Sequence, residues 1–307
     1  MLKVFHHSDF LPIETLVKKK NATNTKISLV IPAFNEAATI GEIIRSASNE
    51  LIKKHILLDE IIVMNSDSTD NTSKIATAEG AKVYSVSSII PEYTTPFGKG
   101  CALWKSQFVA QGDILVCIDA DICNFEPHFI SGLVGPLLFD NDIVLAKAFY
   151  NRPLILDDHI YDNYGGRVTE ILVRPLLWAL MPELAIIKQP LSGEYAFRKK
   201  PLESIPFSSG YGVEIGLIFD IYKMYGLPRI AQVDMGTRCH RNRPINELSI
   251  MSLGIIQTMF RKLSQTNTLS LKNPCHNLMS IQTMHGLKQI ETKDIELPAA
   301  IDMIKAG

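Results

Sequence analysis

Two aspartates that lie two residues apart, Asp119 and Asp121, are the side chains of this 307-residue chain best suited to bind a divalent cation. They follow the run 113–118, whose apolar pattern predicts a buried strand, so both carboxylates stand where that strand reaches solvent. Mg²⁺ is commonly held by one or two carboxylates together with substrate phosphates. Such a pair can hold a cation that in turn binds a diphosphate, although paired aspartates also occur in loops that bind nothing.

Two further polar segments follow predicted strands. Residues 32–36, Pro-Ala-Phe-Asn-Glu, close the strand expected at 27–31, and the Ser/Asp/Thr-rich segment 65–71 follows the strand expected at 60–64. These residue types commonly cap helices or occupy their first turn. Both segments are also placed to contact a nucleotide base or ribose, and the spacing alone leaves the two interpretations open.

Glycines precede two of the predicted helices. In residues 98–100, Gly-Lys-Gly, backbone amides and the Lys99 ammonium group can meet an anion. The segment lacks the upstream glycine and the following Ser or Thr of a Walker P-loop, which excludes a P-loop ATPase. In residues 165–169, Gly-Gly-Arg-Val-Thr, Arg167 and Thr169 suit a phosphate or carboxylate, and an exposed glycine-rich turn is the alternative.

A histidine among three arginines marks the segment 238–243. A single histidine is more often structural than metal-binding, but His240 could complete a metal site with Asp121 in an anion-rich neighbourhood. A serine hydrolase is excluded, because the chain lacks the Gly-x-Ser-x-Gly elbow.

Strand and helix patterns alternate through the first half of the chain. Strands are expected at 27–31, 60–64, 81–85, 113–118 and 143–146. The alternation predicts an α/β fold with a mostly parallel sheet covered by helices on both faces. Ligands of such sheets bind beyond the carboxyl ends of the strands, so we expect the polar segments there to form one site.

The second half is expected to add helices and short strands around this sheet. Helical patterns begin near 167, 210 and 248, strands are expected near 195 and at 230–234, and the tail from 272 is weakly patterned. These patterns predict that the second half forms an α+β part followed by a helical extension.

The bulk composition excludes several classes of protein. The formal net charge of -1 gives no support to nucleic-acid binding. Five scattered cysteines without a close pair argue against a disulfide scaffold or zinc knuckle and favour a reducing cytoplasm. The start of the chain lacks the apolar block of a signal peptide, and no apolar run reaches the ~18 residues of a membrane helix.

The ordered set of motifs resembles a known family. Residues 32–36, the Asp-Ala-Asp at 119–121 and the strand–helix alternation resemble GT-A glycosyltransferases. The segments 165–175, 189–195, 210–216 and 232–241 resemble, more narrowly, the glucosyl-3-phosphoglycerate synthases. The resemblance covers roughly residues 27–265. It implies a retaining transfer of glucose from a nucleoside-diphosphate glucose to 3-phospho-D-glycerate, dependence on Mg²⁺ with Mn²⁺ or Co²⁺ as possible substitutes, and a homodimer.

The resemblance also assigns roles to individual positions. Donor-binding positions are Pro32, Ala33, Phe34, Glu36, Ser66, Lys99, Asp119 and Ala120. Catalytic positions are Asp119, Leu191, Glu214 and Arg238, with Glu214 and the backbone around Leu191 orienting the glucose. Acceptor-binding positions are Gly166, Arg167, Thr169 and Asn242, and the metal ligands are Asp121 and His240. The expected division is an extension (1–26), a nucleotide-sugar half (27–150), an acceptor half (151–271) and a tail (272–307).

Two departures from the family pattern and three alternatives accompany this interpretation. Phe34 replaces the usual leucine and Ala120 the usual serine, so we expect the chemistry to persist and base preference to be the property most affected. The donor base (uridine or guanosine) and the choice of glucose over mannose stay open.

An inverting transferase would need an acceptor-side base, for which Glu194 and Asp234 are candidates. A sugar nucleotidyltransferase would release pyrophosphate, and a non-catalytic binder would release nothing.

Overall fold

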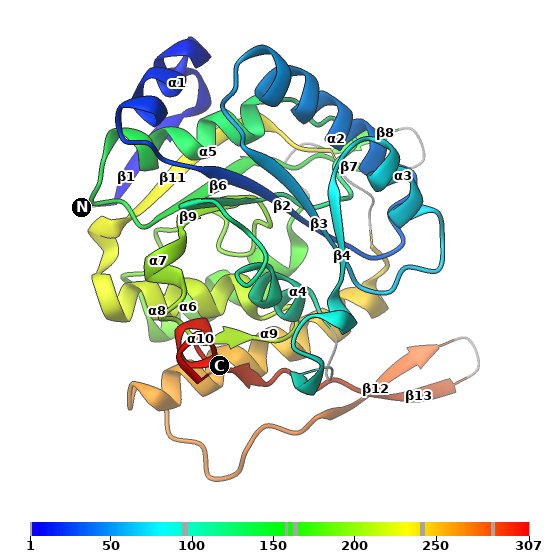
Figure 1. The fold of residues 1–307 in the computed structure, drawn as a ribbon. Helices are drawn as coiled ribbons and strands as arrows, with labels where there is room; N and C mark the ends of the chain where they lie inside the picture. The colour runs from blue at the N-terminus through cyan, green and yellow to red at the C-terminus, as the bar shows by residue number, and fades with distance from the viewer. Residues whose placement is uncertain are drawn as a thin grey trace.

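An eight-stranded sheet with the strand order β1-β11-β6-β9-β5-β2-β3-β4 runs through the middle of the protein (Figure 1). The computed structural model describes residues 2–93, 98–156, 159–161, 165–239, 243–283 and 286–306. The strands of this sheet are β1 (Lys3–His6), β2 (Ile27–Ala33), β3 (Glu60–Asn65), β4 (Lys82–Ser85), β5 (Ile114–Cys117), β6 (Leu145–Asn151), β9 (Tyr195–Arg198) and β11 (Ile230–Thr237). Neighbouring strands are parallel except at β9, which is antiparallel to both β5 and β6. The mostly parallel sheet predicted from the sequence is confirmed.

Helices cover both faces of the sheet. One hydrophobic cluster lies beneath α1 (Ile13–Ala22), α2 (Ile40–Ala47), α3 (Thr72–Ala78) and α5 (His128–Phe139). A second lies beneath α4 (Lys99–Ser106), α6 (Arg174–Leu180), α8 (Val213–Tyr225) and α9 (Ile245–Gln265). Short π-helical segments follow α2 (Ser48–Lys54) and precede α6 (Thr169–Val173). The α/β class and the two-sided helical cover are therefore as predicted.

Strand β5 shows why the central strands read as continuous apolar runs. Ile114 and Val116 pack into the first hydrophobic cluster, and Leu115 and Cys117 pack into the second. Successive side chains of a strand point to opposite faces, so a strand covered on both faces needs an apolar side chain at every position. At the end of β5 this requirement stops, and the chain turns polar at Asp119.

Three elements were not expected from the sequence. The first 26 residues contain strand β1, which extends the sheet beside β11, and helix α1. Their polar composition concealed this, because only Phe10 and Leu16 are buried apolar side chains there. Helix α5 was also missed: ten of its residues are buried, so it lacks the polar face that reveals an amphipathic helix.

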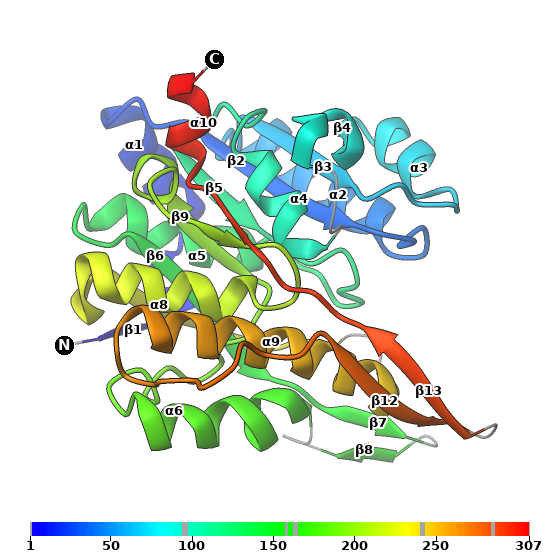
Figure 2. The same cartoon turned by 90° about the horizontal axis from the view of Figure 1, so that it is seen from below.

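The C-terminal tail is more structured than its sequence pattern suggests. Strands β12 (Leu278–Thr283) and β13 (Gly286–Glu291) form an antiparallel hairpin that extends from the body (Figure 2). The chain then returns, β14 (Glu296–Leu297) pairs with β10 (Phe207–Ser208), and α10 (Ala300–Ala306) follows. The helix expected from about 248 is present as α9, and the tail after it adds small antiparallel pairs and the short helix α10.

The other described elements are a hairpin, one turn of α-helix and the 3₁₀ turns His7–Phe10, Val86–Ser88, Pro91–Tyr93 and Leu227–Arg229. Strands β7 (Leu154–Leu156) and β8 (His159–Tyr161) pair antiparallel, and α7 (Lys199–Leu202) follows β9.

Throughout the ranges that the structure describes, no helix is both long and apolar enough to cross a bilayer. All five cysteines are free thiols.

Three imidazoles stack where the N-terminal segment meets α5. The His7 ring lies 4.3 Å from the His6 ring and 4.2 Å from the His128 ring, measured between centroids. Burial, followed by the neighbouring His128 and His6, lowers the pKa of His7 against the opposing influence of Asp234 and Glu126. The native state therefore favours a neutral His7.

We expect this stack to make stability fall in mild acid. A histidine with a lowered pKa binds its proton more readily in the unfolded chain, so its contribution is present above about pH 6.5 and is lost as the pH falls through the native pKa. The free energy of unfolding, measured by urea denaturation between pH 5 and 8, should depend less on pH in His7→Gln. His276→Gln, at an exposed position of the tail, should keep the wild-type dependence; equal slopes in both variants would contradict the expectation.

Candidate active site

A cavity of ≈ 710 Å³ lies at the carboxyl ends of β2, β3 and β5. Loops from the second half of the chain and the first turns of α9 form its other walls. The lining residues are Pro32, Ala33, Phe34, Asn35, Glu36, Ser66, Gly98, Lys99, Asp119, Ala120, Asp121, Arg152, Gly165, Gly166, Arg167, Val168, Thr169, Leu191, Tyr211, Glu214, Arg238, Arg243, Glu247, Leu248, Met251 and Ile255.

Every residue to which the family resemblance assigns a role, and which the structure describes, lines this cavity. The donor set comes from the ends of β2, β3 and β5 and from the start of α4. The acceptor set, represented by Gly166, Arg167 and Thr169, faces the same space from the turn before α6. His240 and Asn242 lie outside the described residues. The structure therefore brings the predicted donor and acceptor groups together, whereas their individual roles stay predictions.

A buried arginine joins the acidic groups of the site. Arg238 is 1% exposed, and its Nη2 donates to Asp119 Oδ2 at 3.1 Å and to Asp121 Oδ1 at 2.9 Å. Its Nε donates to Glu194 Oε1 at 2.9 Å. The hydroxyl of Tyr150 donates to the other oxygen of Glu194, which satisfies that buried carboxylate on both sides. One guanidinium thus fixes three carboxylates from two strand ends.

A second cation couples the acidic pair to α8. Lys99 Nζ lies 2.5 Å from Asp119 Oδ1 and 2.7 Å from Glu214 Oε1. Burial by itself would raise the pKa of Asp119, but the charges of Lys99 and Arg238 outweigh it and hold that pKa well below the usual range. Burial raises the pKa of Glu214 despite the nearby Lys99 and Lys147. Asp119 is consequently a permanent anion in this cavity.

A close backbone approach allows Asp119 to take this position. A Cβ at residue 193 would stand 2.1 Å from Asp119 Oδ2, so only glycine fits beside the carboxylate. The adjacent Ser192 carbonyl accepts a hydrogen bond of 2.6 Å from Lys147 Nζ, a buried amine whose pKa burial lowers to about 8. The loop that carries Leu191 is thereby fixed against the floor of the cavity.

The chemistry of the cavity suits a divalent cation bound to phosphate. Oxygens of Asp119 and Asp121 converge on one point, which Arg238 Nη2 occupies. Arg238 Nη1 is buried and has no hydrogen-bond partner among the described residues. No group of three or more His, Cys, Asp or Glu side chains forms a metal site within those residues. The acidic pair supplies the oxygen ligands that a hard cation prefers, and such a cation commonly takes further ligands from phosphate and water.

Sequence reasoning missed several lining residues. Arg152 follows the end of β6, and it helps to lower the pKa of Asp119. The strand-end rule that located Asp119 could have located Arg152 as well. Met251 and Ile255 belong to the helical pattern expected from about 248, and in the structure this part of α9 lines the cavity. Arg243 was noted only as part of a basic segment, and its carbonyl accepts a 2.8 Å hydrogen bond from Arg167 Nη2.

Comparison with known proteins agrees with this geometry. The family model of Glycosyl transferase family 2 matches residues 28–189. The glucosyl-3-phosphoglycerate synthase of Petrotoga mobilis is 47% identical over 267 residues, which are 87% of this chain and 82% of that protein. The enzyme of the same name from Mycobacterium tuberculosis is 50% identical over 239 residues, 77% of this chain and 73% of that protein.

Solved structures show the same architecture. The crystal structure of glucosyl-3-phosphoglycerate synthase from Mycobacterium tuberculosis in complex with Mn²⁺, UDP-glucose and phosphoglyceric acid has a TM-score of 0.86 at 40% identity, covering 98% of this chain and 99% of that one. Mannosyl-3-phosphoglycerate synthase from Rubrobacter xylanophilus has a TM-score of 0.88 at 34% identity, covering 98% and 96%. By its sequence and its fold, this chain belongs to glycosyl transferase family 2 and, within it, to the glucosyl-3-phosphoglycerate synthases.

Proposed function

We propose that this protein transfers glucose from UDP-glucose to 3-phospho-D-glycerate with retention of the anomeric configuration, in a reaction that depends on a divalent cation. The observation that carries the proposal is the single cavity in which the acidic pair at 119–121 faces the Gly166-Arg167-Thr169 group. Such an arrangement can hold two anionic substrates side by side. The Mycobacterium tuberculosis enzyme, 40% identical in structure comparison, binds UDP-glucose and phosphoglyceric acid.

The donor is proposed to lie along the ends of β2, β3 and β5. Residues 32–36 and Ser66 would hold the nucleotide, with Lys99 and Asp119 beside the diphosphate and sugar. Phe34 is 59% exposed at the cavity, so its ring is free to cover a base. Glu214 and the backbone at Leu191 would orient the glucose.

The acceptor is proposed to bind at the start of the 167–180 helix. Thr169 is 3% exposed, and Arg167 is fixed by its bond to the Arg243 carbonyl. A guanidinium beside a hydroxyl and helix-start amides suits phosphate and carboxylate groups. Asn242 is proposed to complete this group.

A divalent cation fits at Asp121, with His240 as its second proposed protein ligand. When bound, it would neutralise charge that develops on the departing diphosphate. Lys99 and Arg238 are preorganised cations beside the same position, held by Asp119, Glu194 and Glu214. Fixed charges of this kind stabilise a developing anion without reorganisation at the moment of reaction.

Retention requires the acceptor hydroxyl to attack the face from which the diphosphate leaves. A diphosphate oxygen can accept the hydroxyl proton, so the mechanism needs no carboxylate base. The candidate bases of an inverting mechanism support this choice: Glu194 is fully buried and bound by Arg238 and Tyr150, and neither Glu194 nor Asp234 lines the cavity. The protein's main contribution is to hold the two substrates in reactive geometry.

Three further predictions from the sequence are kept as part of this proposal. They are the four-segment division at 26, 150 and 271, the homodimer and the cytoplasmic location. The free state of all five cysteines is compatible with the last of these.

The proposed reaction predicts UDP release that depends on both 3-phosphoglycerate and a divalent cation. Enzyme with Mg²⁺ and 3-phosphoglycerate should release UDP from UDP-glucose, and EDTA should stop the release until Mg²⁺ is restored. NMR of the product should show an α-linkage. Because the Rubrobacter xylanophilus structure is a mannosyl-3-phosphoglycerate synthase, GDP-mannose belongs in the same donor panel. Release without 3-phosphoglycerate, or at full rate in EDTA, would contradict the proposal.

Arg167→Ala is expected to weaken binding of the acceptor and to leave binding of the donor nearly unchanged. Hydrogen bonds to charged groups contribute about 1.5–3 kcal/mol, so KM for 3-phosphoglycerate should rise about tenfold or more, while KM for UDP-glucose changes little. The control is Arg174→Ala: Arg174 bonds to Glu170 on the surface and does not line the cavity. Equal KM values for 3-phosphoglycerate in both variants would refute the assignment.

Arg238→Ala is expected to lower stability as well as activity. The change leaves Glu194 buried without its cation, which typically costs about 3–5 kcal/mol in the free energy of unfolding. Among the described residues, the ion pair of Arg243 is with the partly exposed Glu247, so Arg243→Ala should cost less than about 1 kcal/mol. Urea denaturation measures both, and similar losses would show that the Arg238 network does not support the fold.

A further inference from the structure

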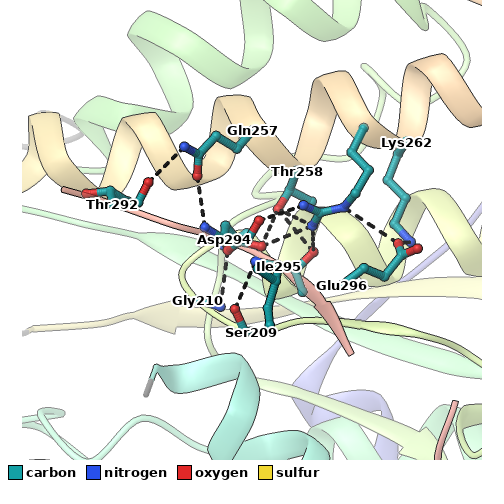
Figure 3. A network of polar contacts seen from close by, with 12 residues as sticks. Ser209, Gly210, Gln257, Thr258, Lys262, Thr292, Asp294, Ile295 and Glu296 are labelled. Carbon is teal, nitrogen blue, oxygen red and sulfur yellow. Dashed lines mark hydrogen bonds and ion pairs between the residues drawn. The ribbon is translucent and has the colours of Figure 1, made fainter. Parts of the chain in front are cut away.

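The segment that returns from the hairpin places a buried carboxylate beneath the active-site loop. Asp294 lies between β13 and β14, and its side chain is 1% exposed. Figure 3 shows it between α9 and the loop that contains Ser209 and Gly210. A buried carboxylate is costly unless each oxygen is bonded, so its partners indicate what it holds.

Both oxygens of Asp294 are fully used. Oδ2 accepts hydrogen bonds from the backbone amides of Gly210 at 3.1 Å and Gly212 at 3.3 Å. Oδ1 accepts from Thr258 Oγ1 and from Arg261 Nη2, each at 3.0 Å. One side of the carboxylate thus binds α9 and the other binds the loop at 209–212.

Backbone hydrogen bonds align the two segments. Ser209 N donates to the Ile295 carbonyl at 2.9 Å, and Ile295 N donates to Ser209 Oγ at 3.1 Å. Asp294 N donates to Gln257 Oε1 of α9 at 2.9 Å (Figure 3). Three hydrogen bonds, to Ser209 and Gln257, thus fix the backbone at residues 294 and 295 in addition to the bonds that the carboxylate itself accepts.

On its opposite side, the same loop contacts the start of α4. Cys101 N donates to the Ser209 carbonyl at 2.8 Å, and Gly100 N to the Gly210 carbonyl at 3.3 Å. A Cβ at residue 100 would stand 1.8 Å from the Ser208 carbonyl oxygen, so the two backbones are in direct contact. The loop at 209–212 is consequently held between Asp294 and the segment that carries Lys99.

This loop leads directly into the cavity wall. Tyr211 and Glu214 line the cavity, and Glu214 pairs with Lys99 at 2.7 Å. We propose that Asp294 of the C-terminal segment is a positioning residue of the active site, which sets the 209–212 loop so that Glu214, Tyr211 and Lys99 keep the geometry needed for the donor sugar. The inference rests on the proposed function and deepens it.

The test compares two neutralising changes two residues apart. Asp294→Asn keeps the size of the side chain, but its amide cannot accept hydrogen bonds both from the loop and from α9. Glu296→Gln is the matched control: Glu296 pairs with Lys262 and Gln265 of α9, and Figure 3 shows it beside Lys262, away from Gly210. Both variants weaken the docking of the tail on α9, and only Asp294→Asn changes the loop.

Two measurements, made well below the melting temperature of both variants, judge the proposal. Amide hydrogen exchange at Gly210 and Gly212 should be about tenfold faster in Asp294→Asn and unchanged in Glu296→Gln. The kcat with UDP-glucose should fall about tenfold or more in Asp294→Asn, since small displacements of a site are costly, while KM for 3-phosphoglycerate stays within about threefold. Glu296→Gln should keep a kcat close to that of the wild type.

Three results would overturn the proposal. They are wild-type exchange in Asp294→Asn, a wild-type kcat in that variant, or equal losses in both variants, which would reduce Asp294 to a general anchor of the tail. Exchange needs no substrate, so it decides the role of Asp294 in holding the loop even if the wild-type protein releases no UDP. That last outcome would overturn the proposed function separately.

Discussion

The active site depends on one buried ion cluster, the contact of Arg238 with Asp119, Asp121 and Glu194. Burying a guanidinium is costly unless it is well paired. Here Nε and Nη2 of Arg238 bond to carboxylates, Nη1 has no hydrogen-bond partner among the described residues, and Tyr150 supplies the second donor to Glu194. A hydrophobic replacement could be as stable, so the cluster is better explained by positioning than by stability. It holds the carboxylates of Asp119 and Asp121 at a fixed separation, as a site for a divalent cation requires.

The antiparallel strand β9 makes this cluster possible. Because β9 lies between β5 and β6 and runs against both, the residues just before it, Gly193 and Glu194, lie at the carboxyl ends of its parallel neighbours. Glu194 thereby reaches Arg238 from beneath, and Gly193 leaves room for Asp119. A parallel strand in this place would present its carboxyl end there instead, and the residues before it would lie at the opposite edge of the sheet. One reversed strand thus joins the first half of the chain to the second.

Features encoded by neighbouring residues could be predicted from the sequence, whereas features that depend on contacts between distant residues could not. Strand β5 and Asp119 were predictable, because burial on both faces and the polar strand end are encoded locally. Helix α5 and strand β1 were not, because one is buried all round and the other is recruited by pairing with β11. The site was predicted as a set of motifs, whereas the ion cluster depends on contacts between residues more than 40 positions apart, which no local pattern reports.

Glu194 illustrates this limit. From the sequence it was a candidate base, since a carboxylate near the acceptor motifs could act as one. In the structure both its oxygens are bonded to buried donors, and it faces Arg238 and Tyr150 and does not line the cavity. The residue type of Glu194 and its position along the chain suit both a catalytic base and a carboxylate that positions Arg238. Only its three-dimensional surroundings distinguish these two roles. A carboxylate with two bonded oxygens and no contact with the cavity can organise an active site, but it cannot take a proton from a substrate bound there.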